Sequence, residues 1–366
     1  MTENNELIDG WIHECQQMFD EIIDKVLNES LGSDFKRLRP SLQKMFDYVL
    51  GNRDLYAFAR ILLSTYSVLS GCGDGGAGGG DEHNQGSNNQ PIDRRVYALV
   101  CAMAMVIIYV DMLDDIMDGS DTRLGKPCWH TLPTVGMSAL NDSTIVLSTT
   151  YKILKLYFSD HQNYVQIVHC IQESIEKTAY GQLLDMQSTR SQTNNVDLNT
   201  YTLDNYRQIN KAKNGDFATG AFLLGMYASG QSSYANLDKI DETLTALAIL
   251  EGVTNDLDDL LTDGTDISEG KCSWLYVRAI QLADNRQKSL LLANYGLPDP
   301  GAVQLIRQLY GELNIKTETE EFIKTEIRLL KQKSLDISST TDNTVLNQLL
   351  NKFIAIYKKY FEYLNI

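Results

Sequence analysis

Two clusters of oxygen-bearing side chains, far apart in the chain, have the residue types and the spacing for metal chemistry. Their members, in chain order, are Asp114, Asp115, Asp118, Asn255, Asp256, Asp259 and Asp263. Helix positions i, i+1 and i+4 share one face, so each cluster projects its oxygens in one direction. Carboxylates this close raise one another's pKa unless a cation lies between them. Oxygen ligands suit Mg²⁺, which also keeps waters and substrate phosphates, so we expect two faces that bind a diphosphate through metal ions.

An alternative interpretation is that each acidic run is a solvated turn, because a short motif matches easily by chance. The segment before the first cluster argues against it, since Val100–Val110 is too apolar for a surface helix. This segment is followed by Asp111 and then by the first cluster itself. A buried helix that ends in four aspartates requires a cation nearby, which favours the metal site.

The composition is that of a globular protein with ample material for a core. The chain has 366 residues, of which 43% are hydrophobic and 22% are charged, and this fits one large domain or two ordinary ones. The net charge of −16 and the isoelectric point of about 4.7 argue against nucleic acid or an anionic membrane surface as a partner. An acidic protein that handles an anionic substrate must supply positive charge locally, through metal ions or a few Lys and Arg side chains.

Cysteine usage and the N-terminal residues both predict a cytoplasmic protein. The six cysteines have no paired spacing, which is typical of a reducing compartment. Residues 1–30 have neither the apolar core of a signal peptide nor the acid-poor composition of a transit peptide. The apolar run Val100–Val110 is shorter than the roughly 20 residues of a membrane span, so we expect no stable membrane insertion.

Apolar residues recur with a helical period along most of the chain, and strand-like alternation is nearly absent. The predicted helices are Leu7–Leu27, Leu42–Val49, Leu55–Leu69, Arg94–Leu113, Ser143–Phe158, Tyr164–Met186, Leu203–Tyr227, Lys239–Leu261, Cys272–Ala293, Ala302–Leu313, Thr317–Lys333 and Asn343–Tyr363. This pattern predicts an all-α fold, a single bundle of about ten helices around a central cavity. One segment differs, because Gly71–Gln90 is rich in Gly and Asn and has no Lys or Arg. We expect a flexible loop there rather than a phosphate-binding P-loop.

Longer stretches around both clusters resemble a known family. Residues 114–130 (DDIMDGSDTRLGKPCWH) resemble the first aspartate-rich motif of farnesyl diphosphate synthases, and residues 255–275 (NDLDDLLTDGTDISEGKCSWL) resemble the second. Residues 181–185 (GQLLD) resemble a further motif of the same family. Lys213 falls where the family has a diphosphate-binding Lys, although Asn214 replaces the Thr that follows it there.

The resemblance to trans-isoprenyl diphosphate synthases implies one isoprenoid synthase domain over residues 1–366, a homodimer and three Mg²⁺ ions. It implies catalytic roles for three aspartates and three cations, namely Asp114, Asp115, Asp118, Arg123, Lys213 and Lys271. It also implies a substrate pocket lined by Tyr109, Val110, Gln182, Asp185 and Asn214. The metal ions and cations hold the diphosphate of an allylic prenyl substrate while its C–O bond breaks.

Three departures from the family concern its second substrate, isopentenyl diphosphate, which it holds with basic and polar side chains. Ile107 stands where the family has Gln, and Leu124 stands where it has the second Arg of a pair. We assign the position of the family's Gly-Lys loop to Gly71–Gln90, which has no cation. Each charge-assisted hydrogen bond contributes about 1.5–3 kcal/mol, so we expect that isopentenyl diphosphate does not bind.

Without that acceptor, the allylic cation must react with its own double bonds, lose a proton or take up water. The chain therefore looks like the terpene synthases that arose from farnesyl diphosphate synthases in insects. Farnesyl diphosphate is the expected substrate, and a sesquiterpene or its alcohol is the expected product. Asn255, Asp259 and Asp263, at i, i+4 and i+8, resemble the Asn/Ser/Glu metal triad of class I terpene synthases.

Two alternatives stay open at this point. One is a short-chain prenyl diphosphate synthase, making farnesyl or geranyl diphosphate, in which Arg94 and Arg95 replace the missing cations. The other is a non-catalytic regulatory subunit of such a synthase. We disfavour the subunit because a purely structural homologue has no need of Asp114, Asp115 and Asp118.

Overall fold

The computed structural model describes residues 2–51, 56–72, 92–189, 201–262, 264–338 and 344–362. Their contacts divide the chain into two compact units. Unit 1 comprises Met1–Ile175 and Gly220–Ala235, and unit 2 comprises Glu176–Thr219 and Asn236–Ile366. We describe each unit by itself.

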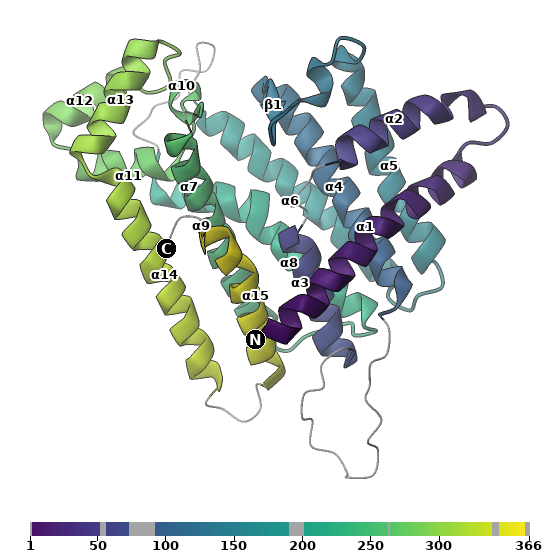
Figure 1. Ribbon diagram of the computed structural model, residues 1–366. Coiled ribbons are helices and arrows are strands. Elements are labelled where there is room, and N and C mark those ends of the chain that lie inside the picture. The colour runs from purple at the N-terminus through teal and green to yellow at the C-terminus, as the bar shows by residue number, and fades with distance from the viewer. Residues whose placement is uncertain are drawn as a thin grey trace. The chain divides into compact units, whose positions relative to one another are not determined.

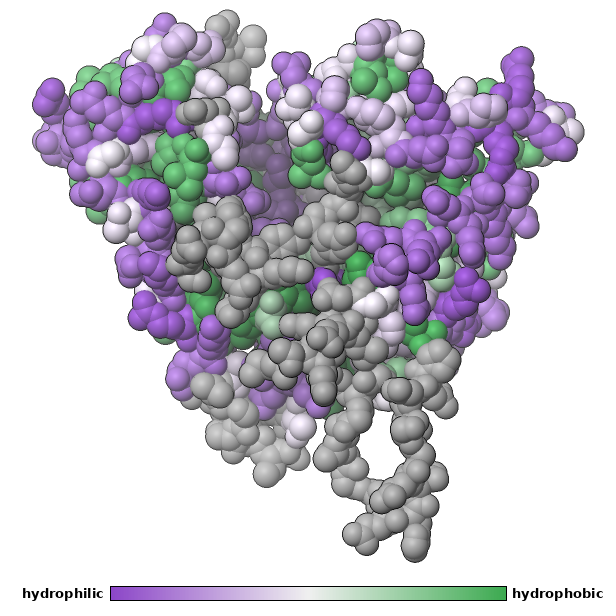
Figure 2. Space-filling view, in the orientation of Figure 1, coloured by the Kyte–Doolittle hydropathy of each residue, from purple (hydrophilic) through white to green (hydrophobic). Residues whose placement is uncertain are grey.

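Unit 1 is built almost entirely of helices (Figure 1). They are α1 (Thr2–Ser30), α2 (Arg39–Leu50), α3 (Tyr56–Ser70), α4 (Arg94–Asp118) and α5 (Ala139–Phe158), with short 3₁₀ turns at Lys36–Leu38, Trp129–Thr131 and Gly136–Ser138. Two further helices, α6 (Tyr164–Ser188) and α8 (Asp216–Ala228), belong in part to each unit. Hydrophilic side chains cover most of what Figure 2 shows of α1 and α2, as expected for amphipathic helices whose apolar faces are buried.

Helix α4 forms the core of unit 1, where it packs against α1, α3 and α5. Its buried residues include an unbroken run from Val96 to Val106, which explains why this segment is apolar on every side. The Asp93 side chain accepts a hydrogen bond from the Arg95 N–H and caps the first turn, and Gly119 (φ 67°) ends the helix. By length and hydropathy α4 could cross a membrane, but 72% of its most apolar window is buried inside the fold, as in the core helix of a soluble protein.

A two-stranded hairpin follows α4. Strand β1 (Thr122–Arg123) pairs antiparallel with β2 (Lys126–Pro127), and the turn between them is Leu124–Gly125. Both turn residues have positive φ, 51° for Leu124 and 75° for Gly125. A positive φ is strained for a leucine, so the hairpin holds this side chain against its local preference.

Unit 2 is also helical (Figure 1). Its elements are α7 (Leu203–Asn210), a π-helical turn (Lys211–Gly215), α9 (Leu237–Leu261), α10 (Asp266–Glu269), α11 (Trp274–Leu282), α12 (Asn285–Asn294), α13 (Pro300–Glu312), α14 (Ile315–Ser338) and α15 (Thr344–Glu362). Helix α9 packs against α14, α15 and the π-helical turn. Within the core of unit 2, the rings of Tyr276 and Tyr295 stack with their centroids 4.0 Å apart.

The all-α prediction is confirmed, and two of the predicted helices are divided. Residues 272–293 form α11 and α12 because Ala283 is extended and Asp284 starts a new helix with a capping box to Gln287. Residues 203–227 are interrupted by the π-helical turn. Periodicity did not reveal either break, since the apolar pattern continues through both. The prediction of a flexible loop at Gly71–Gln90 concerns residues of which only Gly71 and Cys72 are described.

Candidate metal centre

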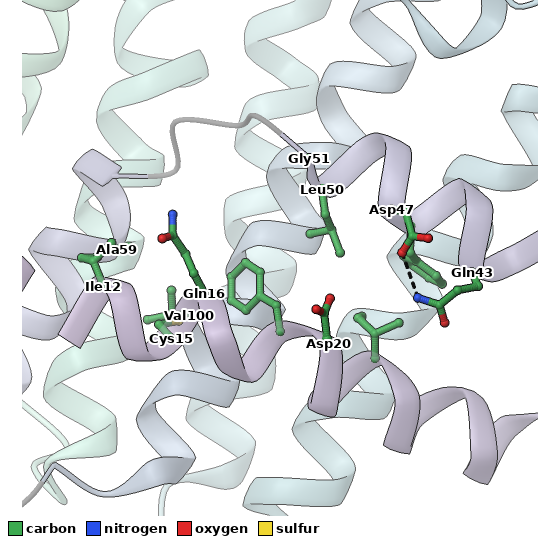
Figure 3. A pocket seen from close by; sticks show the side chains of 13 residues that line it. Ile12, Cys15, Gln16, Asp20, Gln43, Asp47, Leu50, Gly51, Ala59 and Val100 are labelled. Atoms are coloured by element: carbon green, nitrogen blue, oxygen red, sulfur yellow. Dashed lines mark hydrogen bonds between the residues drawn. The ribbon is translucent and has the colours of Figure 1, made fainter. Parts of the chain in front are cut away.

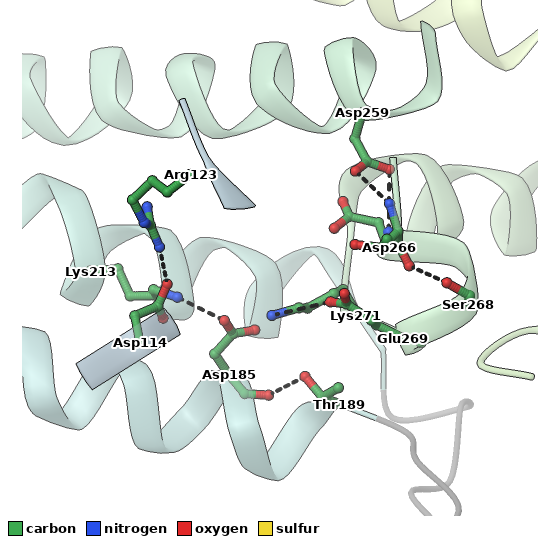
Figure 4. Close-up of polar contacts among 12 residues, drawn as sticks. Asp114, Arg123, Asp185, Thr189, Lys213, Asp259, Asp266, Ser268, Glu269 and Lys271 are labelled. Atoms are coloured by element: carbon green, nitrogen blue, oxygen red, sulfur yellow. Dashed lines mark hydrogen bonds and ion pairs between the residues drawn. The ribbon is translucent and has the colours of Figure 1, made fainter. Parts of the chain in front are cut away.

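The first aspartate cluster lies on the last turns of α4, where Arg123 from the hairpin reaches it (Figure 4). The Arg123 guanidinium donates from Nε to Asp115 Oδ1 (2.6 Å) and from Nη2 to Asp114 Oδ2 (2.9 Å). A third carboxylate, Asp111, lies 3.6 Å from Nη1. Asp115 is 3% exposed, so its charge is withdrawn from water. Asp118, one turn further on, is half-buried.

The carboxylates of this cluster shift the pKa values of the side chains around them. Burial by itself lowers the pKa of Arg123, but the carboxylates of Asp111, Asp115 and Asp114 outweigh it and raise that pKa above its ordinary value. Burial and the neighbouring Asp115 raise the pKa of the Cys128 thiol to about 12, which keeps this thiol neutral. In the structure Arg123 is a cation that lies beside these carboxylates, and the metal ion expected from the sequence stays a prediction.

The hairpin also brings a second cation, Lys126, to the end of α2. Its Nζ donates to the carbonyl oxygen of Gly51 (3.2 Å), and the Tyr48 hydroxyl donates to the carbonyl oxygen of Pro127 (2.7 Å). A cavity of about 40 Å³ opens here, and Arg123 and Lys126 are among the residues that line it. Two basic side chains thus lie beside the aspartates. Lys126 was not among the predicted site residues.

This arrangement corrects the assignment of the Gly-Lys loop to Gly71–Gln90. Of the described residues nearest to residues 73–91, Cys72 follows the end of α3 and Ile92 directly precedes the N-terminal end of α4. The aspartates lie towards the other end of this 25-residue helix, with Asp114 about 30 Å from Arg94 at 1.5 Å per residue. The segment that adjoins the hairpin is instead the end of α2 at Gly51. The residues that follow Gly51 in the sequence, Asn52 and Arg53, lie outside the described residues. Arg53 is a cation, so the sequence directly after α2 does contain positive charge, unlike Gly71–Gln90.

Arg94 and Arg95, the suggested replacements for missing cations, are also at the far end of α4. Arg94 pairs with Glu21 (3.2 Å), and Arg95 pairs with Asp93 (2.8 Å). Both are therefore engaged with carboxylates about 30 Å along the helix from Asp114. The interpretation that Arg94 and Arg95 replace the missing cations is therefore wrong. Tyr109 and Val110, which we expect to shape the substrate pocket, are half-buried on α4 just before the cluster.

The second cluster lies in unit 2, at the end of α9 and in the loop beyond it. The Asp256 carboxylate accepts a hydrogen bond from the backbone N–H of Trp274 (2.6 Å). The Asp259 carboxylate accepts from the N–H groups of Thr265 (3.0 Å) and Asp266 (3.3 Å). These backbone donors hold both carboxylates in fixed positions before any metal binds.

Glycine is required in the loop that holds Asp259. A Cβ atom at Gly264 would stand 1.8 Å from Asp259 Oδ1, far inside van der Waals contact. Gly264 also donates its N–H to the carbonyl oxygen of Asp259 (2.8 Å). The backbone therefore wraps closely around this side chain, and only a residue without a side chain permits it.

A third acid joins this cluster, and it was not among the predicted ligands. Asp266 begins α10, and burial together with Asp256 and Asp259 raises its pKa well above the ordinary value. Burial, with the charges of neighbouring acids, raises the pKa of Asp256 to about 7, and burial also raises the pKa of Asp259. Burial raises the pKa values of all three acids, and a bound metal ion would stabilise their charged forms. Asp266 stands inside the second motif, so its position next to the cluster was the available signal.

Asn255 and Asp263 were also predicted to be metal ligands of this cluster. Asn255 lies on α9 one turn before Asp259 and is exposed. Asp263 lies outside the described residues. The predicted common face of Asn255, Asp259 and Asp263 is therefore described only for Asn255 and Asp259, which lie one turn apart on α9, and α9 ends at Leu261.

The lysine predicted to bind diphosphate pairs with the predicted pocket aspartate (Figure 4). Lys213 Nζ lies 2.8 Å from Asp185 Oδ2. The close approach of α6 and the π-helical turn makes this possible, because a Cβ atom at Gly181 would stand 2.7 Å from the Lys213 nitrogen. Both side-chain polar atoms of Gln182 are buried without a hydrogen-bond partner among the described residues, and Asn214 is half-buried. A buried amide in that state is open to a ligand.

Lys271 lies beside the acids of unit 2. Its Nζ is 3.8 Å from Glu269 Oε2, and its charge lowers the raised pKa of Asp266. It is mostly withdrawn from solvent, with 17% of its side chain exposed. A lysine so placed can neutralise an anion bound beside Asp266, and the catalytic role expected for Lys271 stays a prediction.

The residues of both units fit Mg²⁺ as a bound ion. Their donor atoms are oxygens, and burial together with neighbouring carboxylates raises the pKa values of Asp256 and Asp266, which a bound cation would oppose. Among the described residues no group of three His, Cys, Asp or Glu side chains is already arranged around one point. Mg²⁺ does not require this, because it keeps several waters and binds through one or two carboxylates together with substrate phosphates.

Comparisons with known proteins point in the same direction. Residues 20–313 match the family described as Polyprenyl synthetase. Farnesyl pyrophosphate synthase 1 of Cannabis sativa is 34% identical over 261 residues, which are 69% of this chain and 74% of that protein. Farnesyl pyrophosphate synthase 1 of Parthenium argentatum is 29% identical over 94% of this chain and 96% of that protein. The chloroplastic monoterpene synthase FDS-5 of Artemisia spiciformis is 27% identical over 84% of this chain and 75% of that protein.

A solved structure shares the fold. The crystal structure of T. brucei farnesyl diphosphate synthase matches with a TM-score of 0.80 over 95% of this chain and 99% of that chain, at 23% identity. At this identity the likeness concerns the architecture alone. The all-α fold inferred from periodicity is therefore the one that this enzyme has.

Proposed function

Because the chain belongs to the polyprenyl synthetase family, we propose that it is an Mg²⁺-dependent enzyme that ionises an allylic prenyl diphosphate. The observation that carries this proposal is the contact of Arg123 with three carboxylates at the end of α4. A cluster of this kind has the charge pattern of a site for metal ions and phosphate oxygens, and so, within unit 2, do the three acids whose pKa values are raised.

The side chains have separate roles in this proposal. Asp114, Asp115 and Asp118, and in unit 2 Asn255, Asp256 and Asp259, supply metal ligands. Arg123, Lys213 and Lys271 donate hydrogen bonds to the diphosphate, and they stabilise the negative charge that grows on it as the C–O bond breaks. Bound Mg²⁺ ions supply Lewis-acid neutralisation of the leaving group. To reach the substrate, Arg123 and Lys213 exchange their present carboxylate partners for phosphate oxygens.

The first candidate for the step that follows ionisation is condensation with isopentenyl diphosphate. Two of the three relatives named above are farnesyl pyrophosphate synthases, and this favours prenyl diphosphate synthesis over the terpene synthase reaction expected from the sequence. The position of Lys126 at Gly51 supports it too, because this cation lies beside Arg123 in a small cavity. Such a pair of cations suits a second diphosphate.

The second candidate is a terpene synthase reaction, in which the cation of farnesyl diphosphate reacts within its own chain and ends as a sesquiterpene or its alcohol. Leu124 favours it, because an apolar side chain that is 64% exposed occupies the hairpin turn where the family resemblance calls for an Arg. Ile107, half-buried on α4, cannot donate the hydrogen bonds of the Gln that the family has there. A monoterpene synthase among the relatives supports the same possibility.

One pair of incubations separates the candidates. Purified protein with Mg²⁺ receives farnesyl diphosphate alone, or isopentenyl diphosphate with dimethylallyl or geranyl diphosphate, and products are identified by mass spectrometry. An elongated diphosphate as the main product supports the first candidate, and a volatile hydrocarbon or alcohol from the single substrate supports the second. No turnover of either substrate set contradicts the proposed enzyme and favours the regulatory subunit.

The matched variants for this assay are Asp114→Ala and Asp121→Ala. Asp114→Ala should abolish product formation, because it removes a carboxylate that contacts Arg123. Asp121 is an exposed aspartate a few residues later, and its removal should leave activity unchanged. We also propose, from the family resemblance, three Mg²⁺ ions per subunit, a homodimer and a cytoplasmic location without stable membrane insertion. Metal analysis, sedimentation and cell fractionation test these in turn.

A further inference from the structure

Unit 1 contains a second, larger cavity that none of the proposed chemistry uses. It has a volume of about 370 Å³ and opens among α1, α2, α3 and α4 (Figure 3). The lining residues are Ile12, Cys15, Gln16, Phe19, Asp20, Ile23, Gln43, Phe46, Asp47, Leu50, Gly51, Ala59 and Val100. This volume is within the usual range for sites that hold a small molecule.

The floor of this cavity is apolar, and its side chains are fixed. Phe19 and Ile23 of α1 are 9% and 1% exposed, and Phe46 of α2 is 1% exposed. Ala59 of α3 and Val100 of α4 complete the floor, at 5% and 4%. Cys15, which also faces it, donates its S–H to the carbonyl oxygen of Tyr97 at 3.7 Å and is a neutral, buried thiol. An apolar body of several carbons would be desolvated on this surface.

The rim of the cavity is negative. Asp20 projects from α1 and Asp47 from α2, and both are exposed (Figure 3). Gln43 donates from Nε2 to Asp47 Oδ1 (2.9 Å), which holds Asp47 in place. No Lys or Arg is among the described residues that line the cavity. Two carboxylates above an apolar floor repel anions and attract a cation at the mouth.

We propose that this cavity is a binding site for a small amphipathic cation, an alkyl- or arylalkylammonium whose apolar body lies on the floor and whose ammonium lies between Asp20 and Asp47. A bare metal ion does not fit, because the floor offers no oxygen ligands. An apolar acid does not fit, because its carboxylate would meet the two aspartates at the rim. Gly51 lines both this cavity and the small cavity beside Arg123 and Lys126, whereas Val100 on the floor lies about 21 Å along α4 from Asp114.

The test compares three probes that share one apolar body and differ in the charge of the head group: 4-phenylbutylamine, 4-phenylbutanol and 4-phenylbutyrate. Isothermal titration uses the full chain at pH 7.5 without Mg²⁺ or diphosphate. The amine is expected to bind about tenfold more tightly than the alcohol, and the carboxylate more weakly than the alcohol. Absence of binding by the amine, or equal binding by amine and alcohol, overturns the proposal.

Variants locate the site and exclude the aspartates of α4 as the place where the amine binds. In Asp20→Asn/Asp47→Asn the preference for the amine over the alcohol should disappear, whereas a preference that persists places the amine elsewhere and overturns the proposal. Glu29→Gln, an exposed carboxylate of α1 outside the cavity, should keep the tenfold preference. Ala59→Leu fills the floor and should weaken the amine and the alcohol alike, with folding checked by thermal melting. Unchanged binding in a folded Ala59→Leu variant also contradicts the site.

Discussion

Arg123 Nε lies 2.6 Å from Asp115 Oδ1, and this contact joins the hairpin to the last turns of α4. The arginine is one-third exposed, whereas the Asp115 side chain is 5% exposed. The carboxylate therefore depends on Arg123 for its charge balance, because water reaches it poorly. A metal ion at the same oxygens has to compete with the guanidinium.

This competition predicts the metal affinity of an Arg123 variant. Arg123→Gln should bind Mg²⁺ several-fold more tightly than the wild type in the absence of substrate, because the carboxylates lose their internal cation. Its turnover should fall, since a donor to the diphosphate is lost. Titration calorimetry with MgCl₂ measures the first effect and a steady-state assay the second. Arg123→Lys keeps the positive charge and should lie closer to wild type in both; an unchanged Mg²⁺ affinity in Arg123→Gln would show that the guanidinium does not compete.

The packing of Gly264 against Asp259 predicts a loss of metal binding without a loss of fold. Gly264→Ala places a methyl group where Asp259 Oδ1 now lies, so the carboxylate must rotate away from the Thr265 and Asp266 N–H groups. We expect at least a tenfold weaker response to Mg²⁺ in activity, with helical circular dichroism preserved. The control is Gly311→Ala on α13, where a Cβ atom meets nothing within 4 Å. Equal Mg²⁺ responses in the two variants would contradict the assigned role of Asp259.

Lys126 predicts the behaviour of the second substrate if the protein condenses isopentenyl diphosphate. Lys126→Gln should raise KM for isopentenyl diphosphate about tenfold or more, since a charge-assisted hydrogen bond contributes about 1.5–3 kcal/mol. KM for geranyl diphosphate should change little. Lys44→Gln, an exposed lysine on α2, is the control. If KM for both substrates stays constant in Lys126→Gln, the cavity beside Gly51 is not the acceptor position.

Leu124 predicts the outcome of restoring the family's second Arg. Leu124→Arg by itself should not convert a protein that releases terpenes into one that elongates, because Ile107 still lacks a hydrogen-bond donor. The product ratio from mixed substrates, measured by mass spectrometry, gives the answer. Substantial elongation by this single variant would mean that the acceptor position needs only one further cation.

The lowered pKa of His161 predicts that the stability of the folded protein depends on pH. This histidine is not part of either aspartate cluster. Its Nδ1 accepts a hydrogen bond from the Asn163 N–H (3.1 Å), and burial together with Arg95 lowers its pKa. Above the ordinary histidine pKa of about 6.5 the ring is neutral in both states; below it the unfolded chain takes up a proton that the folded protein resists. Melting temperature should therefore fall as the pH drops from 7.5 to 5.5, and less so in His161→Gln. An equal fall in both proteins would assign the effect to other groups.

Local sequence patterns determined much of this protein. The helical period predicted an all-α chain because apolar faces repeat whatever packs against them, and α4 and α9 were expected close to their observed bounds. The spacing of Asp114, Asp115 and Asp118 predicted one acidic face, and residue type alone indicated oxygen ligands. These properties depend on neighbours within one or two turns of a helix, which the sequence contains directly.

Tertiary structure decided which distant groups meet. It brought Lys126 to Gly51 and put Asp266 beside Asp256 and Asp259. It also showed that the end of α2, at Gly51, adjoins the hairpin that carries Arg123 and Lys126. Charge balance between such groups depends on distance and burial in three dimensions, and neither can be read from residue spacing.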